Sequence, residues 1–495
     1  MLQKEGHQFT SETDTEVIAH LIEKNFEGNL ETAVRKSLKQ LKGAYSLVII
    51  SRDDPGKIVA VRLSSPLIIG VSENNGPEYI VASDAMAIAP LTKEVINLED
   101  NEVVVISPDN FLILKERQPE KLEMEVEDIQ KGGYAHFMLK EIMESPEAVE
   151  NSIKGRLITE EGLAKLGGLQ DVEDQLRKIK RLNIVACGTA SYAAMVGRYM
   201  LEEYAGIPVE ADIASEFRYR KPIMDESAAL LCISQSGETA DTLAALREIK
   251  RRGFLTLGIV NATSSTLARE TDAGIYNHIG PEIGVAATKS FVSQLSILAL
   301  LTLFLGRQRN LSLVKGQRIV QDIQGLSAKM KMVLETSDQV KALAEKYSKF
   351  NNFIYLGRKY NYPIALEGAL KLKEIAYPIH AEGFAGGEMK HGPLALADEN
   401  FPCIFIAPQD SVYEKTLSNM EEVKTRKAPI LAVATEGDEK IKEVADDVIY
   451  IPQTSEMLTP ILTVLPLQLF AYHMGVLRGC DVDKPRNLAK SVTVE

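Results

Sequence analysis

Short apolar runs recur through the middle and the end of the chain. They lie at 181–188, 229–234 and 257–261, and again at 351–357, 402–407 and 431–435. Each run is too rich in Ile, Val and Leu to alternate between two faces, as is typical of parallel strands that are covered on both sides. Segments with helical spacing follow the runs, for example at 240–251 and 364–376. The pattern predicts an α/β fold with parallel sheets.

The two sets of runs form an internal repeat. Corresponding runs lie 169, 173 and 174 positions apart. Any two α/β segments can look alike, but three runs in the same order with near-equal offsets favour a repeat. We therefore expect two tandem doubly wound units, at 166–325 and 326–480, followed by a tail at 481–495.

The first 130 residues have a different pattern. Short strand-like runs alternate with turn clusters such as 53–56 and 74–77, which predicts an α+β sheet domain at 1–130. The runs lie at 45–50, 57–61, 67–71, 79–82, 102–106 and 111–115. We interpret 131–165 as a linker that packs between the domains.

Composition narrows the class of protein. With 495 residues the chain is expected to form about three domains, and its 45% hydrophobic and 25% charged residues are typical of a soluble globular protein. The net charge of −13 argues against a nucleic-acid partner. We find neither an apolar stretch of membrane-spanning length nor a secretory leader, and so predict a cytoplasmic protein without a membrane partner.

The four cysteines suggest no metal or redox chemistry. Cys187, Cys232, Cys403 and Cys480 are widely spaced, and the first three lie within or beside apolar runs. No paired spacing of the kind found in metal or disulfide sites occurs. We expect reduced thiols in or near the protein core.

A candidate anion site follows the apolar run at 229–234. Ser234, Ser236 and Thr239 supply hydroxyl groups, Gly237 allows a tight turn, and a predicted helix begins directly afterwards. The free N–H groups and the positive dipole end of a helix favour a phosphate dianion. The alternative is an ordinary capped helix start.

Three charged residues share one face of the helix predicted at 364–376. Glu367 and Lys371 are four positions apart, and Lys371 and Glu374 are three apart. Spacing alone is compatible with salt-bridged pairs on the protein surface. It is equally compatible with an acid–base group in an active site.

Four motifs together carry a family resemblance. They are Ser-Gln-Ser-Gly-Glu-Thr-Ala-Asp-Thr at 234–242, Ala-Leu-Glu-Gly-Ala-Leu-Lys-Leu-Lys-Glu-Ile at 365–375, Gly-Glu-Met-Lys-His-Gly-Pro at 387–393 and the final segment 481–495. In this order they resemble the isomerising glutamine–fructose-6-phosphate aminotransferases, or glucosamine-6-phosphate synthases. The resemblance implies two sugar isomerase (SIS) domains behind a partial N-terminal-nucleophile-type glutaminase domain. It also implies a sugar phosphate substrate, no cofactor, no metal and a homodimer.

The resemblance also assigns roles to particular residues. It assigns catalysis to Lys490, His391, Glu374 and Lys371, and substrate binding to Thr189, Ser234, Gln235, Ser236, Thr239, Val285 and Ala489. Lys490 would form a Schiff base with the open-chain sugar, and His391, from a neighbouring subunit, would open the ring. Glu374 would move the proton between C1 and C2, with assistance from Lys371.

The glutaminase module resembles its family only in its later portion. Asp14 matches a carboxylate of the glutamine pocket. The family places its nucleophilic cysteine next to the initiator methionine, whereas residue 2 here is Leu. We therefore expect that about a hundred residues of the usual module are absent and that the chain as given retains only the isomerase chemistry.

Two positions depart from the family pattern within the isomerase half. Ala190 and Ala287 stand where many relatives carry serine, and each removes one possible hydrogen bond to the sugar. Whether Ser191 compensates for Ala190 stays open, although neighbouring side chains at a helix start point in different directions. Two other functions stay open: a non-catalytic sugar-phosphate sensor, and a phosphosugar isomerase that uses no ammonia. A sensor would need an effector segment such as a basic helix-turn-helix, which we do not find.

Overall fold

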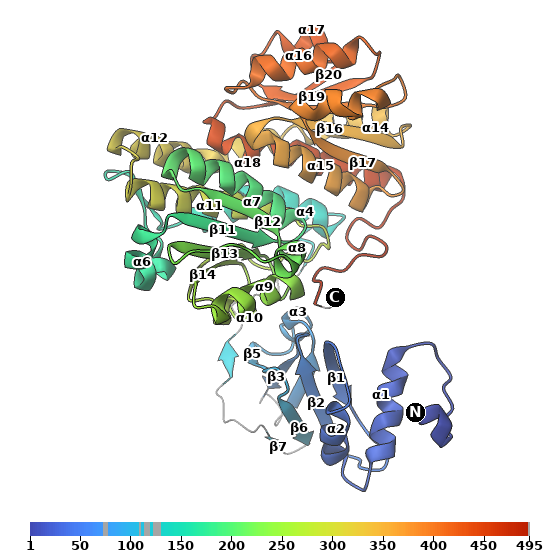
Figure 1. Ribbon diagram of the computed structural model, residues 1–495. Coiled ribbons are helices and arrows are strands. Elements are labelled where there is room, and N and C mark those ends of the chain that lie inside the picture. Colours follow the sequence, from blue (N-terminus) through green and yellow to red (C-terminus); the bar gives the residue numbers. More distant parts are fainter. Residues whose placement is uncertain (73–77, 108–109, 113–118, 122–129, 494–495) are drawn as a thin grey trace. The chain divides into compact units, whose positions relative to one another are not determined.

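A computed structural model gives the structure of the protein (Figure 1). It describes the chain except residues 73–77, 108–109, 113–118, 122–129 and 494–495. The chain divides into two compact units, of which the first comprises Met1–Gln130 and the second Lys131–Ser491. Val492 and Thr493 group with the first unit.

The first unit contains two antiparallel four-stranded sheets and two main helices. One sheet has the order β1-β2-β6-β7 and the other β4-β3-β5-β8. Its helices are α1 (Asp14–Asn25), α2 (Leu30–Leu38) and the short α3 (Ala85–Ile88). Its strands are β1 (Tyr45–Ile49), β2 (Ile58–Leu63), β3 (Ile68–Ser72), β4 (Glu78–Ala82), β5 (Glu94–Asn97), β6 (Val103–Ser107), β7 (Asn110–Leu112) and β8 (Glu120–Lys121).

Alternation along the strands explains the layers of this unit. Val59 and Val61 on β2 pack with α1 and α2, whereas Ala60 between them packs with residues of the second sheet such as Ile69. Successive side chains of a strand point to opposite faces, so one strand contributes to both apolar layers. All six predicted strands correspond to observed ones, although 113–115 and the turn at 74–77 lie outside the described residues. The sequence pattern missed β5 and β8.

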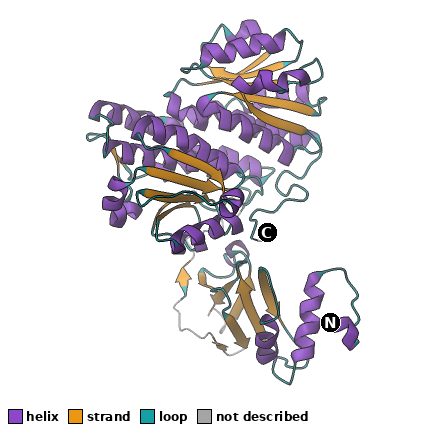
Figure 2. Ribbon diagram, viewed as in Figure 1, coloured by secondary structure: helices purple, strands orange, loops and turns teal. Residues whose placement is uncertain are grey.

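The second unit contains two five-stranded parallel sheets with the same topology (Figure 2). The first has the order β12-β11-β13-β14-β15 and the second β17-β16-β18-β19-β20. The first sheet consists of β11 (Arg181–Ala186), β12 (Val209–Ile213), β13 (Ala228–Ser234), β14 (Leu255–Val260) and β15 (Ala273–Tyr276). The second consists of β16 (Asn352–Gly357), β17 (His380–Ala385), β18 (Cys403–Ala407), β19 (Ile430–Thr435) and β20 (Asp447–Ile451). The predicted α/β repeat is thereby confirmed.

Helices cover both faces of these sheets. They are α6 (Glu173–Lys178), α7 (Thr189–Met200), α8 (Ala214–Tyr219), α9 (Ala240–Arg251), α10 (Thr266–Glu270), α11 (Lys289–Arg307), α12 (Leu313–Gln324), α13 (Leu326–Leu334), α14 (Ser337–Tyr347), α15 (Tyr362–Ile375), α16 (Tyr413–Lys424), α17 (Ile441–Val444) and α18 (Thr459–Leu477). On β13, Leu231 and Ile233 pack into the core with α7 and α11, whereas Leu230 and Cys232 pack on the side of α8 and α9. This two-sided burial explains why the strands read as continuous apolar runs.

The segment 131–165 is more than the linker that we expected. It folds into α4 (Phe137–Met143), α5 (Ser145–Ile153) and a small hairpin of β9 (Leu157–Ile158) and β10 (Leu163–Ala164). Met138, Ile142 and Val149 are fully buried in the core of the second unit. Helix α5 packs on α11 and α13, so these residues form part of the second unit itself.

Our expectation about long apolar stretches is wrong. Two helical segments are long and apolar enough to cross a membrane, Lys289–Arg307 and Glu456–Leu477. However, 94% and 89% of their apolar windows are buried inside the second unit. Helices that are apolar on all sides are also typical of the centre of a large soluble core, and both helices occupy that position here.

Candidate active site

A group of predicted site residues lies where the strand order of the first parallel sheet reverses. β12 pairs with one side of β11 and β13 with the other. In open parallel sheets ligands bind at such a switch point, at the carboxyl ends of the strands. Thr189 follows β11 and begins α7, while Ser234 ends β13 and Gln235–Thr239 lie between β13 and α9.

The loop after β13 is held by its own hydroxyl groups. The Gly237 N–H donates to Ser234 Oγ at 3.0 Å and the Glu238 N–H donates to Ser236 Oγ at 3.2 Å, while Ser234 Oγ and Thr239 Oγ1 lie 3.1 Å apart. Gly237 has a φ of +67°, and a Cβ there would lie 2.1 Å from Ser265 Oγ. Thr239 precedes α9 without capping it through its side chain. The first N–H groups of α9 therefore have no side-chain cap from Thr239, as an anion site requires.

The three charged residues of α15 form a buried cluster. Lys371 Nζ lies 2.5 Å from Glu374 Oε2 and 3.7 Å from Glu367 Oε1, and the Thr189 hydroxyl donates to Glu367 Oε1 at 3.3 Å. Glu367 and Lys371 have exposed fractions of 0% and 1%, whereas the Glu374 side chain is 20% exposed. The surface-pair interpretation is therefore wrong. Of the three, only Glu374 presents its carboxylate to solvent or a ligand.

Burial determines the protonation of this cluster. Burial and the nearby charge of Glu374 raise the pKa of Glu367 to about 8, although Lys371 opposes the shift. Burial alone would lower the pKa of Lys371, but the carboxylates of Glu367 and Glu374 raise it. At neutral pH the arrangement therefore favours a charged Lys371 beside a protonated Glu367.

Lys490 lies in a second charged group formed by the tail and the loop before α11. Its Nζ donates to Glu282 Oε2 at 2.6 Å and to the Gly284 carbonyl at 2.8 Å. Glu282 is fully buried and also accepts from the Thr288 and Ser290 N–H groups and from the Ser290 hydroxyl. Burial would raise the pKa of Glu282, but Lys490 and these donors hold it below its ordinary value.

Glu141 on α4 holds the same loop through two hydrogen bonds. Its Oε1 accepts the N–H groups of Ile283 and Gly284 at 2.5 and 3.1 Å, while its buried Oε2 has no hydrogen-bond partner among the described residues. Burial and the negative charge of Glu282 raise the pKa of Glu141 above its ordinary value. Sequence reasoning missed Glu141 and Glu282, because only the fold brings α4, the loop and the tail together.

The two charged groups belong to one electrostatic environment. The carboxylate of Glu282 contributes to the raised pKa of Lys371. The structure thus brings together Thr189, Glu367, Lys371 and Glu374, and places Glu282, the partner of Lys490, close enough to contribute to the raised pKa of Lys371. Cations and carboxylates alternate across this region, which suits proton transfer on a polar substrate.

Other predicted residues are placed as follows. Val285 and Ala489 flank the Lys490 contacts in sequence, and the Val285 N–H donates to the Asp483 carbonyl at 3.0 Å. Gln235 lies half-buried in the loop after β13, and its carbonyl accepts the Asn261 N–H at 3.2 Å. His391 ends a 3₁₀ helix and is exposed, and no hydrogen bond among the described residues joins it to Lys490 or α15. Asp14 begins α1 in the first unit.

The structure also shows the surroundings of Ala190 and Ala287, the two positions that depart from the family pattern. Ala190 and Ala287 are half-buried and offer no polar side-chain atom. The Ser191 hydroxyl donates to the Gly188 carbonyl at 2.6 Å, so it is already used in the turn before α7. This contact favours the alternative in which Ser191 does not replace a serine at position 190. The four cysteines are unpaired, as expected.

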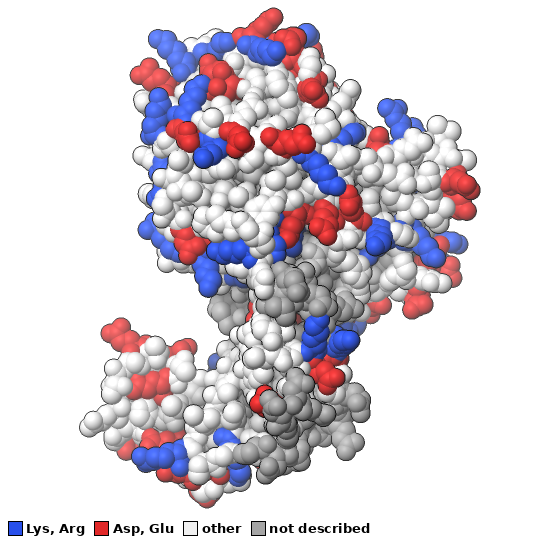
Figure 3. All heavy atoms as spheres, turned by 180° about the vertical axis from the view of Figure 1, so that it is seen from behind, with Lys and Arg blue, Asp and Glu red and all other residues white. Residues whose placement is uncertain are grey.

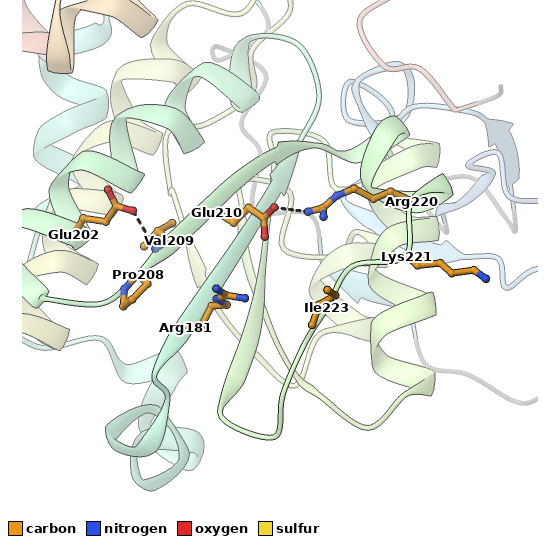
Figure 4. A pocket seen from close by; sticks show the side chains of 8 residues that line it. All are labelled: Arg181, Glu202, Pro208, Val209, Glu210, Arg220, Lys221 and Ile223. Atoms are coloured by element: carbon orange, nitrogen blue, oxygen red, sulfur yellow. Dashed lines mark hydrogen bonds and ion pairs between the residues drawn. The ribbon is translucent and has the colours of Figure 1, made fainter.

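A separate hollow lies at the opposite ends of the strands (Figure 4). It encloses about 400 Å³ near the starts of β11 and β12 and is lined by Arg181, Glu202, Pro208, Val209, Glu210, Arg220, Lys221 and Ile223. The Arg220 guanidinium is already paired with Glu210 and Asp212, at 2.8 and 2.6 Å. The hollow is therefore unlike the loop after β13, where the hydrogen bonds among the described residues join the hydroxyl groups to one another and to backbone N–H groups.

Comparison with known proteins matches each unit to a domain family. A model of the SIS domain matches residues 175–304 and 346–478, and a model of a glutamine amidotransferase domain matches residues 1–91. The C-terminal domain of glucosamine-fructose-6-phosphate aminotransferase from Francisella tularensis aligns with a TM-score of 0.68 and 38% identity, over 72% of this chain and 100% of that one. Tagatose-6-phosphate ketose/aldose isomerase from Escherichia coli, at 17% identity and a TM-score of 0.59, shares the fold. Fold and site together define a protein with tandem SIS domains behind a glutamine amidotransferase domain.

Full-length relatives identify the family. The chain is 48% identical over its whole length to the glutamine–fructose-6-phosphate aminotransferase [isomerizing] of Chlorobaculum tepidum, covering 81% of that protein. It is equally similar to the enzyme of Thermus thermophilus, at 48% identity over 82% of that protein. The chain belongs to the family of isomerizing glutamine–fructose-6-phosphate aminotransferases.

Proposed function

We propose that this chain converts fructose 6-phosphate to glucosamine 6-phosphate with ammonia as the nitrogen donor. The observation that carries the proposal is the buried cluster of Glu367, Lys371 and Glu374, which approaches the Lys490–Glu282 pair within one isomerase-like unit. This site offers a lysine amine, a reachable carboxylate and a nearby anion loop. Those groups suffice for amination and proton transfer on a ketose phosphate.

Each group has a defined task in the proposed reaction. The loop Ser234–Thr239, with Gln235, holds the phosphate, and Thr189, Val285 and Ala489 border the sugar. His391 opens the ring, and Lys490 holds the open chain through a Schiff base. The carbonyl oxygen at C2 leaves as water when the Schiff base forms, and ammonia then adds at C2 and displaces the Lys490 amine. Glu374, assisted by Lys371, takes a proton from C1 and returns it to C2, while the proton of the C1 hydroxyl passes to the C2 nitrogen. The product is the aldose amine.

Assembly and location are part of the proposal. His391 is exposed and has no hydrogen bond to Lys490 among the described residues, which supports a homodimer in which His391 serves the neighbouring site. On the face in Figure 3 basic and acidic side chains are interspersed, which supports a small anionic substrate rather than a nucleic acid. We propose a cytoplasmic enzyme without a membrane partner.

The direct test is an assay on the purified 495-residue polypeptide. With fructose 6-phosphate and ammonium chloride we expect glucosamine 6-phosphate, detected by coupled assay or mass spectrometry. A folded protein that forms neither glucosamine 6-phosphate nor glucose 6-phosphate contradicts the proposal and favours a sugar-phosphate sensor. Formation of glucose 6-phosphate alone, whether or not ammonium is present, favours the ammonia-independent isomerase.

Glutamine provides a second test. Residues 1–130 contain no cysteine, and the family's mechanism depends on a cysteine that carries the free α-amine. We therefore expect this polypeptide to release no glutamate from glutamine above a heat-inactivated control. Turnover of glutamine would contradict this part of the proposal.

Subunit mixing tests the shared site. H391A and K490A proteins should each be inactive, and hybrid dimers formed by dissociation and reassociation should recover one complete site. Verified hybrids without recovered activity would argue for sites built within one chain.

A further inference from the structure

Two imidazoles and a carboxylate converge in the first unit, far along the chain from the residues of the proposed reaction. His7, in the segment before α1, places its Nδ1 3.1 Å from the Nδ1 of His20 on α1. Glu23, one turn further along α1, places Oε2 3.6 Å from His7 Nδ1 and 3.4 Å from His20 Nδ1. The three atoms thus form a nearly equilateral triangle.

The size of this triangle fits a tetrahedral metal ion. Zinc binds imidazole nitrogen and carboxylate oxygen at about 2.0–2.2 Å, so neighbouring ligand atoms of a tetrahedral site lie about 3.3 Å apart. The three observed separations surround that value. His, His and Glu are also a donor set that zinc uses, with water as the fourth ligand.

A second carboxylate supports His20 from its other side. Glu16 Oε1 lies 3.7 Å from His20 Nε2, so the ring nitrogen that faces away from the triangle meets an acceptor. Histidine ligands commonly have such a carboxylate partner, which fixes the ring and its tautomer. Glu16 is itself held by four hydrogen bonds, from the backbone and hydroxyl groups of Thr10 and Ser11.

The same contacts explain why Glu16 stays ionised. The Ser11 hydroxyl and the N–H groups of Thr10 and Ser11 lower the pKa of Glu16 to about 2. The centroid of the Phe9 ring lies 4.6 Å from that of the His20 ring. His20 therefore has neighbours that fix its orientation before any ion binds.

We infer that His7, His20 and Glu23 form a binding site for a divalent transition metal ion of the zinc class. Glu16 acts as a positioning residue for His20. A bound ion would join the segment before α1 to the helix itself, next to the Lys24–Glu5 ion pair, which makes the same connection. The inference is independent of the proposed reaction, since none of these residues belongs to the isomerase-like unit.

The alternative is a cluster held only by a hydrogen bond between two neutral imidazoles. Metal titration of the full chain, after removal of metal by a chelator, separates the two. We expect one saturable site for Co²⁺, seen as visible absorption of a four-coordinate ion, and competition by Zn²⁺ in calorimetry. Binding should weaken as the pH falls, because protons compete with the metal ion for its ligand atoms.

Variants locate the site. H7A, H20A and E23Q should each weaken Co²⁺ binding by at least about 100-fold, and E16Q by about 10-fold through the orientation of His20. The matched control is H380A, which removes the imidazole of another histidine–carboxylate pair, His380 with Glu382 at 3.4 Å. It should bind Co²⁺ like the wild type. Circular dichroism of the metal-free variants checks that they fold, and E23Q is the variant least expected to disturb packing.

Either of two results would overturn the inference. One is the absence of saturable binding of Co²⁺ or Zn²⁺ to the folded wild-type chain. The other is binding that is unchanged in folded H7A/H20A protein, which would place the ion elsewhere.

Discussion

The two parallel sheets of the second unit share a topology but differ in chemistry at the same place. In the first repeat, β13 ends in the hydroxyl-rich loop Ser234–Thr239. In the second, β18 ends at Ala407 and is followed by Asp410 and Ser411 before α16. The position that suits an anion in one repeat therefore carries a carboxylate in the other.

The strand order of the second sheet reverses at β16 and β18, and at this second switch point side chains of the two repeats contact each other. Lys359, just after β16, pairs with Glu456 at 3.0 Å and with Glu203 of the first repeat at 2.9 Å. Burial and the charge of Glu456 raise the pKa of Asp410 to about 6. A phosphate there would lie beside acidic groups, and the nearby cation, Lys359, is already paired with Glu203 and Glu456. The second switch point therefore serves as an interface between the two repeats. Fold symmetry alone thus does not predict two sugar sites.

The largest expected effect lies on α15, which is the helix that carries the proposed acid–base residues of the second repeat. E374Q should slow formation of glucosamine 6-phosphate by about 100-fold or more, because the amide keeps the shape of the carboxylate but cannot accept the proton. Steady-state rates with ammonium chloride measure the effect. E421Q, an exposed change on α16 of the same repeat, is the control and should match the wild type. An E374Q enzyme as fast as wild type contradicts the assigned role.

The comparison of the two loops predicts the next effect. S236A/T239A should weaken fructose 6-phosphate binding by about 10-fold or more, because the loss of even one hydrogen bond to a charged group costs about 1.5–3 kcal/mol. S411A, at the corresponding loop of the second repeat, should leave the affinity unchanged. Calorimetry measures both variants, and fructose without phosphate should bind far more weakly than fructose 6-phosphate. Equal losses in both variants would show that the loops do not differ as the structure indicates.

Glu367 predicts a pH dependence of stability. Its folded pKa of about 8 lies above the ordinary value of 4.5, so the folded state retains a proton that the unfolded chain releases. This contribution to stability is fully present below about pH 4.5 and is lost as the pH rises towards about 8. Relative to wild type, E367Q should therefore gain melting temperature between about pH 5 and pH 8, as measured by thermal unfolding. A difference that stays constant over this range contradicts the assigned protonation.

Glu141 should have the smallest effect and distinguishes support from chemistry. E141A leaves the Ile283 and Gly284 N–H groups without their acceptor and should lower the rate by about 10-fold, since an unsatisfied buried donor costs about 1–3 kcal/mol. E141Q keeps an acceptor and should retain most of the rate, with a pH profile that loses the titration of this group. Comparison of kcat/KM across pH in the two variants provides the measurement. Equal rates in both variants would show that the loop does not depend on Glu141.

Periodicity and motif order in the sequence determined much of this protein. The continuous apolar runs predicted buried parallel strands, and their spacing predicted the repeat, because a strand covered on both faces leaves no polar alternation. The sequence also predicted the hydroxyl groups after β13 and the common face of Glu367, Lys371 and Glu374. Both features depend on residues that are close in sequence.

Only the tertiary structure decided which of these groups are buried and which meet. Lys490 and Glu282 are 208 positions apart, and Glu141 lies further still from Lys490 in sequence, so no local pattern joins them. The same holds for His7 and His20, which are 13 positions apart and face each other only because the segment before α1 folds back. Burial is likewise a property of the whole fold: an identical Glu–Lys–Glu spacing on an exposed helix would be a solvated surface pair. In this protein α15 packs against α18 and β17, and this packing buries its three charged residues as a cluster.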